Sequence, residues 1–254
     1  MIRLLRYRTL VASLVARDLK LKYRGSLLGV CWSLLNPLLL LAVYTVAFSH
    51  VMRVDQPNYP AFLLSGLLPW LFFAGALRDA TVSVTTQGAL LRKLPFPAES
   101  LPVSTVLFHL AQFGLALLAG IPLSLLAGSR PGWTLALLPA LVALHALFVV
   151  GLALLVSALS VPYRDVIHLT EVGLLLLFWL TPVAYPLALA PPALRTLLGL
   201  SPITAFSAAY QDLLFFGRAP AGLAWLALLA ATTLALALGT LVFRAQAPRF
   251  PEVL

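Results

Sequence analysis

The sequence has 254 residues, of which 61% are hydrophobic and only 10% are charged, and its mean hydropathy is +1.00. Soluble domains carry roughly 25% charged residues, so this composition excludes an ordinary soluble enzyme and indicates a multi-pass membrane protein. The net charge of +9 requires no nucleic acid, because Lys and Arg beside a membrane are attracted to anionic lipid headgroups.

The N-terminal segment is predicted to form an amphipathic helix on the cytoplasmic membrane surface. At about 100° per residue, Arg17, Lys20 and Arg24 share one arc, and the opposite apolar side is interrupted by Asp18 and Lys22. Two interpretations stay open: a solvated basic anchor, or a site where Lys and Arg collect an anionic headgroup such as a lipid-linked diphosphate. The candidate headgroup residues are Arg17, Lys20, Lys22, Tyr23 and Arg24.

The rest of the chain contains six uncharged stretches, each at least as long as the roughly 20 residues that a helix needs to cross a bilayer. They predict an all-α polytopic fold with one transmembrane domain covering residues 1–254. The surface helix occupies residues 1–25, and the predicted spans are 26–52, 61–85, 103–127, 133–157, 167–186 and 221–243.

The distribution of Lys and Arg predicts the orientation. With six spans both termini lie on one side, and that side collects 13 of the 17 cations. They are Arg3, Arg6, Arg8, Arg17, Lys20, Lys22, Arg24, Arg78, Arg92, Lys93, Arg164, Arg244 and Arg249. By the positive-inside rule both termini are expected in the cytoplasm, with the protein in the cytoplasmic (inner) membrane.

The loop 86–102 between the second and third spans carries an unusual apolar turn. A short helical run begins at Ala89 and is stopped by Pro95 and Pro97. Its apolar side chains suggest docking into a groove on another protein, and an amphipathic turn resting on the membrane is the alternative. The candidate coupling residues are Leu90, Leu91, Arg92, Lys93, Leu94 and Phe96.

The connection 187–220 between the last two spans is apolar and broken by Pro and Gly into two short helical pieces. Pieces of this length suit re-entrant or interfacial segments, so a re-entrant helical hairpin is predicted at the outer end of a pathway.

Aromatic residues in the first and fifth spans are candidates for a sugar-stacking channel lining. They are Trp32, Tyr44, Phe48, Phe178, Trp179 and Tyr185. Interfacial aromatic belts are a competing explanation, which suffices for Trp32 and Tyr185 near span ends. Intramembrane acids are nearly absent, and this argues against a proton-coupled carrier.

Catalytic and metal sites are not expected. Cys31 is a single cysteine, and the four histidines, His50, His109, His145 and His168, show no HExxH pattern. We therefore expect no catalytic residue, no metal ligand and no cofactor in this chain.

Six segments, in order along nearly the whole chain, resemble the membrane subunits of ABC exporters for lipid-linked polysaccharides such as O-antigen, capsule and teichoic acid. They are GSLLGVCWSLLNPLL, LLRKLPFPAESLPV, PYRDV, TPVAYP, LSPITAF and FRAQAPRFPEVL. The sequence departs from the usual pattern at Ser201, where Asn is common, and at Gln211, where Arg is common.

The resemblance implies a permease that works as a homodimer with two copies of a cytoplasmic ABC ATPase, which would bind ATP and Mg. No GxxxxGK[ST] phosphate loop occurs in this sequence, so ATP would be hydrolysed on that partner. The cargo would be a polysaccharide on an undecaprenyl-diphosphate type lipid. The resemblance also implies that 89–96 is the coupling helix and that the basic N-terminal helix forms a gate.

Two other functions remain open. One is an ABC permease that exports a hydrophobic drug or free lipid, and the other is a channel or scaffold that uses no ATP.

Overall fold

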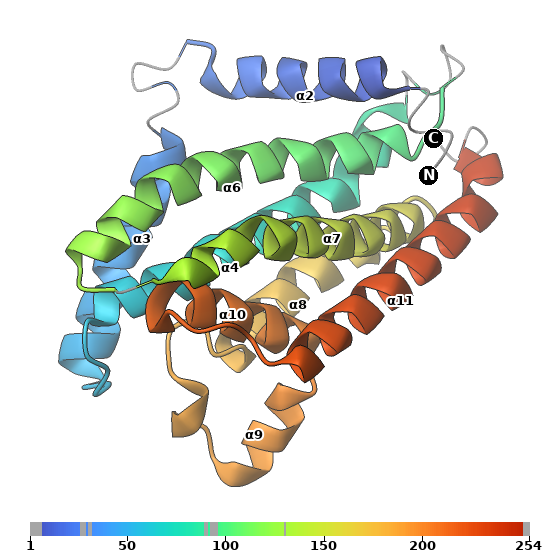
Figure 1. Cartoon of the computed structure of the whole chain (residues 1–254). Coiled ribbons are helices and arrows are strands. Elements are labelled where there is room, and N and C mark those ends of the chain that lie inside the picture. The colour runs from blue at the N-terminus through green and yellow to red at the C-terminus, as the bar shows by residue number, and fades with distance from the viewer. Residues whose placement is uncertain are drawn as a thin grey trace.

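A computed structural model describes residues 7–25, 29, 32–88, 91, 96–129 and 131–250, and these residues form helices with no strand among them. Figure 1 shows α2 (Arg8–Tyr23) lying across one end of a helical bundle, and the short α9 (Pro192–Gly199) at the other end. The long helices between them are α3 (Trp32–Thr45), α4 (Tyr59–Thr86), α6 (Ser100–Leu126), α7 (Leu138–Ser160), α8 (Asp165–Leu180) and α11 (Gly222–Gln246).

Five helical stretches in the described part of the chain are long and apolar enough to cross a membrane. They are Trp32–Val51, Tyr59–Thr86, Ser100–Leu126, Trp133–Ser160 and Gly222–Arg249, which include the turns η2 (Val46–Val51), η3 (Trp133–Leu137) and η6 (Ala247–Arg249). All five match predicted spans. Each consists of Leu- and Ala-rich sequence, in which helical hydrogen bonds satisfy the backbone without water.

The helix α8 ends before the predicted boundary of the fifth span, 167–186, and the extent of that span stays a prediction. α8 has only 16 residues and ends at Leu180, which gives a length of about 24 Å at 1.5 Å per residue. Pro182 lacks the N–H that a continuing helix needs, and a residue before proline disfavours helical backbone. The chain therefore leaves the helix at Thr181, and the count of six spans stays a prediction.

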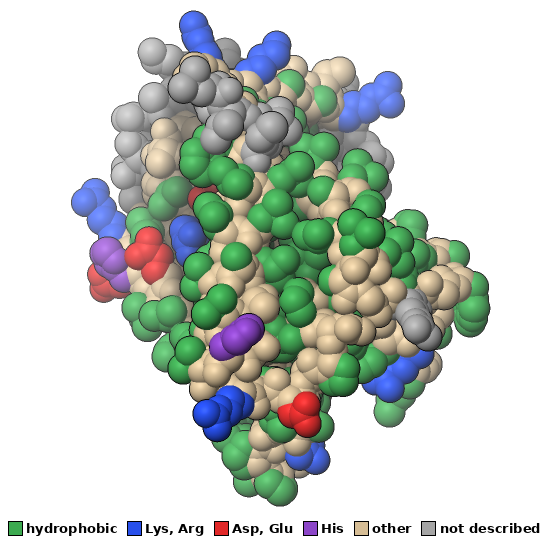
Figure 2. Space-filling view, turned by 90° about the vertical axis from the view of Figure 1, so that its left-hand side faces the viewer, with side chains coloured by type: hydrophobic (Ala, Val, Ile, Leu, Met, Phe, Trp, Pro, Cys, Tyr) green, Lys and Arg blue, Asp and Glu red, His purple; other side chains and the backbone are tan. Residues whose placement is uncertain are grey.

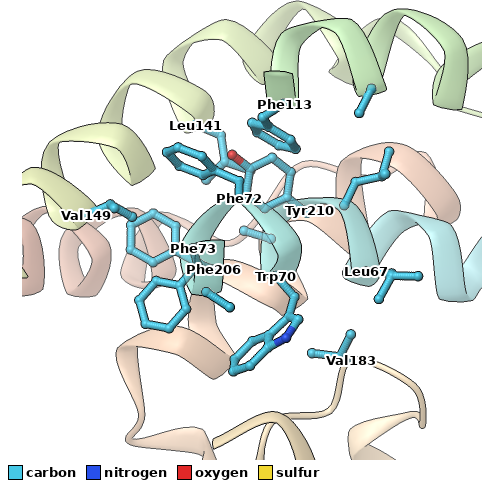
Figure 3. Close-up of a cluster of buried hydrophobic side chains, with 14 of the residues drawn as sticks. Leu67, Trp70, Phe72, Phe73, Phe113, Leu141, Val149, Val183, Phe206 and Tyr210 are labelled. Atoms are coloured by element: carbon cyan, nitrogen blue, oxygen red, sulfur yellow. The ribbon is translucent and has the colours of Figure 1, made fainter. Parts of the chain in front are cut away.

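The core forms around α4, whose side chains are mostly buried. α6, α7, α8 and α10 (Pro202–Gln211) pack against it. Figure 3 shows the aromatic centre, where Phe72 and Phe73 of α4 meet Phe113 of α6 and Tyr210 of α10. The Phe72 and Phe113 rings stack with centroids 5.2 Å apart.

The outer surface stays apolar. Figure 2 shows mostly hydrophobic side chains across the middle of the face that carries α3, with Lys and Arg projecting at the top. α8 buries only Leu174 among its residues, whereas Leu169, Leu175, Leu176 and Trp179 are exposed. Such faces suit lipid or another apolar helix.

α7 and α11 form the closest helix pair. Gly151 of α7 and Gly239 of α11 face each other, and a Cβ atom on either residue would overlap the backbone of the other helix. Small residues at this seam allow the close backbone approach that favours helix association in membranes.

Candidate functional site

α2 packs on α6 through its apolar side. Val11 and Leu14 are buried there, and two polar contacts hold the helix along its length. The Arg17 guanidinium donates to the Gln87 side-chain oxygen at 3.3 Å, at the end of α4. Lys22 Nζ donates to Gln112 Oε1 on α6. α2 is therefore tied to both α4 and α6.

The predicted basic arc lies on the outward side of α2. Arg17, Lys20 and Arg24 are exposed and lie together on the open surface along the helix. Arg17 pairs with Asp18 at 2.9 Å, whereas Lys20 and Arg24 make no ion pair within the described residues. Lys20 and Arg24 are thus two uncompensated cations on this surface, and Arg17 beside them is bonded to Asp18 and Gln87.

Lys22 and Tyr23, grouped with this arc in the sequence-based prediction, point elsewhere. The Lys22 ammonium lies 5.6 Å from the Phe108 ring centroid, beneath α2. Burial lowers the pKa of Lys22, and the nearby Asp79 carboxylate opposes that shift. The Tyr23 hydroxyl forms a hydrogen bond with Ser33 of α3. The five candidate headgroup residues therefore divide between two faces of the helix, and their role in headgroup binding stays a prediction.

The aromatic candidates cluster where α3 meets α8. Tyr44 stacks on Phe178 with centroids 5.5 Å apart, and Phe48 lies 6.3 Å from Trp179. Phe48 and Trp179 differ in their exposed fraction, which is 4% for Phe48 and 55% for Trp179 in the single chain. Within this cluster Trp179 thus presents more surface to any pathway than Phe48 does.

The rings of the other two aromatic candidates do not stack on this cluster, although Tyr185 lies at its edge. Trp32 is at the start of α3, beside a pocket beneath α2. The Tyr185 hydroxyl donates to the carbonyls of Trp179 and Leu180, at 3.1 and 3.2 Å, where α8 ends. The structure therefore brings four of the six aromatic candidates together, and their role as a channel lining stays a prediction.

The coupling segment is described in part. Leu90, Arg92, Lys93 and Leu94 lie outside the described residues. The Leu91 N–H donates to the Gln87 carbonyl at 3.2 Å, and its side chain packs against a small cluster that contains Val84, Leu154 and Phe243. Phe96 is half-buried. Leu91 thus supports the chain's own packing in addition to any partner contact.

The segment after α8 is non-helical backbone inside the protein, a feature that the sequence did not reveal. The Tyr59 hydroxyl donates to the Ala184 carbonyl at 2.7 Å, and Gln211 Nε2 donates to the Pro182 carbonyl at 2.8 Å. A Cβ at Gly66 would lie 2.9 Å from the Val183 carbonyl oxygen, so only glycine leaves room for this approach. Such backbone is tolerated at membrane depth where protein groups satisfy it.

We expect Gln211→Leu to destabilise the protein by about 1–3 kcal/mol, because the buried Pro182 carbonyl would lose its short hydrogen bond and keep only the long one from the Ser207 hydroxyl at 3.5 Å. The measurement is the thermal unfolding midpoint of the purified protein in detergent. Gln246→Leu, at the C-terminal end of α11, is the matched control. An unchanged midpoint for Gln211→Leu would show that the hydrogen bond contributes nothing.

The helices α9 and α10 lie in the connection between α8 and α11. Each begins with a proline, Pro192 and Pro202, whose fixed φ suits the first helical turn. α9 is mostly exposed, whereas α10 is mostly buried. The turn η5 (Asp212–Phe216) then ends at Gly217, where φ is 63°. The two helices agree with the predicted helical pair, and re-entry into the bilayer stays a prediction.

No group of three or more His, Cys, Asp or Glu side chains that could hold a metal ion occurs within the described residues. The molecule instead combines membrane-length helices, a basic helix across one end and a buried break after α8. Together these features define a multi-pass helical membrane protein.

The chain belongs to the ABC-2 type transporter family of membrane proteins, whose family model matches residues 9–215. It is 36% identical to the O-antigen export system permease protein RfbA of Myxococcus xanthus, over 99% of each chain. It is 30% identical to a protein of the same name from Klebsiella pneumoniae, over 82% of this chain and 81% of that one. A second Klebsiella pneumoniae protein of that name is 29% identical over the same shares.

Proposed function

We propose that this chain is the permease subunit of an ATP-driven exporter for a polysaccharide attached to a lipid diphosphate carrier. The observation that carries the proposal is the exposed basic face of α2, with Arg17, Lys20 and Arg24 together at the end of the bundle. The names of the relatives, which are O-antigen export permeases, support the cargo class.

The assembly that we propose is a homodimer bound to two copies of a cytoplasmic ABC ATPase, which supplies ATP and Mg. The exposed apolar faces of α3 and α8 are available for a second copy of the chain. Both termini would lie in the cytoplasm, with the α2 end of the bundle facing the ATPase. Most described Lys and Arg belong to α2 or to helix ends on the α2 side, whereas Arg53, Arg195 and Arg218 belong to connections on the α9 side, and by the positive-inside rule this distribution supports the proposed orientation.

Within this assembly the basic helix would serve as the headgroup gate. α9 and α10 would close the outer end of the pathway as a re-entrant hairpin. The α3–α8 aromatic cluster would line the path of the sugars, because aromatic rings stack on sugars without requiring one sugar sequence. The segment 89–96 would receive the movement of the ATPase.

Replacing Arg17, Lys20 and Arg24 together by Gln is expected to lower binding of the lipid carrier by at least tenfold. Charge-assisted hydrogen bonds contribute roughly 1.5–3 kcal/mol each. The matched control replaces Arg164, Arg244 and Arg249, which are exposed on other helices or loops. Both variants keep ten of the 13 cations predicted to be cytoplasmic (13 − 3), so topology should survive in both.

The measurement is carrier binding and carrier-stimulated ATPase activity of the reconstituted complex at equal expression. Equal losses of carrier binding in the two variants would show that α2 is a simple membrane anchor and would contradict its proposed function as a gate. Stimulation by free lipid or by a hydrophobic drug, with none by the lipid-linked glycan, would favour the alternative cargo. A complex that transports without ATP would favour a channel.

A further inference from the structure

A polar pocket of about 280 Å³ lies beneath α2, between α3, α4 and α6. Its basic side chains are Lys22 from α2, Arg78 from α4 and His109 from α6. The function proposed above uses the opposite, outward face of α2 and leaves this pocket unassigned.

The polar groups of the pocket are incompletely satisfied. Arg78 makes no hydrogen bond or ion pair within the described part of the chain. Gln112 uses Oε1 to accept from Lys22, but its Nε2 is buried without a partner. An unpaired buried donor costs free energy, so an acceptor-rich ligand in this pocket would stabilise Gln112, and the exposed Arg78 would gain a partner for its charge.

The charge of the pocket identifies the class of ligand. No carboxylate lines it among the described residues, and Asp79 lies just outside, where it accepts a hydrogen bond from His109 at 2.7 Å. Lys22 and Arg78 supply two positive charges, and the one carboxylate nearby, Asp79, is already hydrogen-bonded to His109. Two cations on different helices suit the phosphate of an anionic lipid headgroup.

An apolar groove of about 210 Å³ continues from the pocket. Pro37, Leu68 and Ala116 line both spaces. The groove lies between α3 and α6 and includes Ala119, Gly120 and Leu123. Figure 1 shows that α6 diverges from α2 toward this end. A charged space that opens into an apolar groove along the spans has the polarity of a membrane lipid, with its head toward α2 and its tail toward the bilayer centre.

We propose that this pocket binds one anionic glycerophospholipid, with its phosphodiester on Lys22 and Arg78 and one acyl chain in the groove between α3 and α6. The lipid would join α2 to α4 and α6 through its phosphate. Basic pockets between membrane helices bind anionic headgroups by the same electrostatics. The site is independent of the transported cargo.

The test measures lipid retention by the full-length permease, purified in mild detergent and titrated with phosphatidylglycerol or phosphatidylcholine under native mass spectrometry. The wild type is expected to prefer phosphatidylglycerol, and Arg78→Gln should weaken that binding at least tenfold. Arg244→Gln is the matched control, because it removes the same charge from a side chain that is 65% exposed on α11. It should bind phosphatidylglycerol as the wild type does.

A second variant tests the groove without changing charge. Ala119→Phe fills the apolar space and should also weaken phosphatidylglycerol binding, and soluble glycerol phosphate should not compete. Equal affinity of the wild type for the two lipids, or unchanged binding in both site variants, would overturn the proposal. Competition by glycerol phosphate would also overturn it. The proposal would fail as well if a polyprenyl diphosphate displaced phosphatidylglycerol one for one and if Arg78→Gln abolished binding of that polyprenyl diphosphate. The last result would assign the pocket to the carrier and leave the export function standing.

Discussion

Replacing Gly239 with leucine is expected to prevent stable folding in the membrane. Gly239 of α11 lies directly against the Gly151 carbonyl of α7, and the space for a Cβ is already occupied by that backbone. Overpacking in a core typically costs about 1–3 kcal/mol, and occasionally more. We expect a cost of about 3 kcal/mol or more, because two helix backbones, rather than a flexible side chain, would have to separate.

The measurement is the yield of monodisperse protein and its thermal unfolding midpoint after extraction. Gly114→Leu is the matched control, since Gly114 lies in α6 and a Cβ on this residue would meet no neighbouring group within 4 Å. The same change should be tolerated there. Equal yields and midpoints for the Gly239 and Gly114 variants would show that the α7–α11 seam can open at little cost.

Much of the fold was predictable because long uncharged stretches have few alternatives in a bilayer. Five of the predicted spans match apolar helices of membrane length, since each follows from its own local sequence. The end of α8 was not located, although Pro182 marked it, because the apolar run continues past the point where the backbone leaves the helix. Hydropathy predicts which stretches of sequence can lie in lipid, but it does not predict the residue at which a helix ends.

Contacts between segments that are distant in the chain could not be predicted from the sequence. The outward position of Arg17, Lys20 and Arg24 agrees with the 100° periodicity, which is a local property. The bond from Gln211 to the Pro182 carbonyl joins residues 29 positions apart. The contact between Lys22 and Gln112 joins residues 90 positions apart. Its only trace in the sequence was that Lys22 interrupts the apolar side of α2. One sequence does not specify such pairings.

Phe96→Asp is expected to abolish export while the protein still inserts and folds. Phe96 is half-buried and belongs to the segment that we propose docks into an apolar groove of the ATPase. Burying a carboxylate in such a groove should cost several kcal/mol, which is enough to weaken association by more than about a hundredfold. Leu91→Asp is a poorer choice, because Leu91 also packs against the chain's own cluster of Val84, Leu154 and Phe243.

The measurement combines copurification of the ATPase with an export assay at equal membrane levels of permease. Phe96→Leu should retain both activities, because it keeps an apolar side chain. Leu200→Asp introduces the same carboxylate at a site that is 78% exposed near α9, at the other end of the bundle, and it should leave ATPase association intact. If Phe96→Asp still copurifies with the ATPase and exports at the wild-type rate, Phe96 does not contact the ATPase. Coupling would then have to pass through another segment that we propose to be cytoplasmic, and the loop between α7 and α8 is one described candidate.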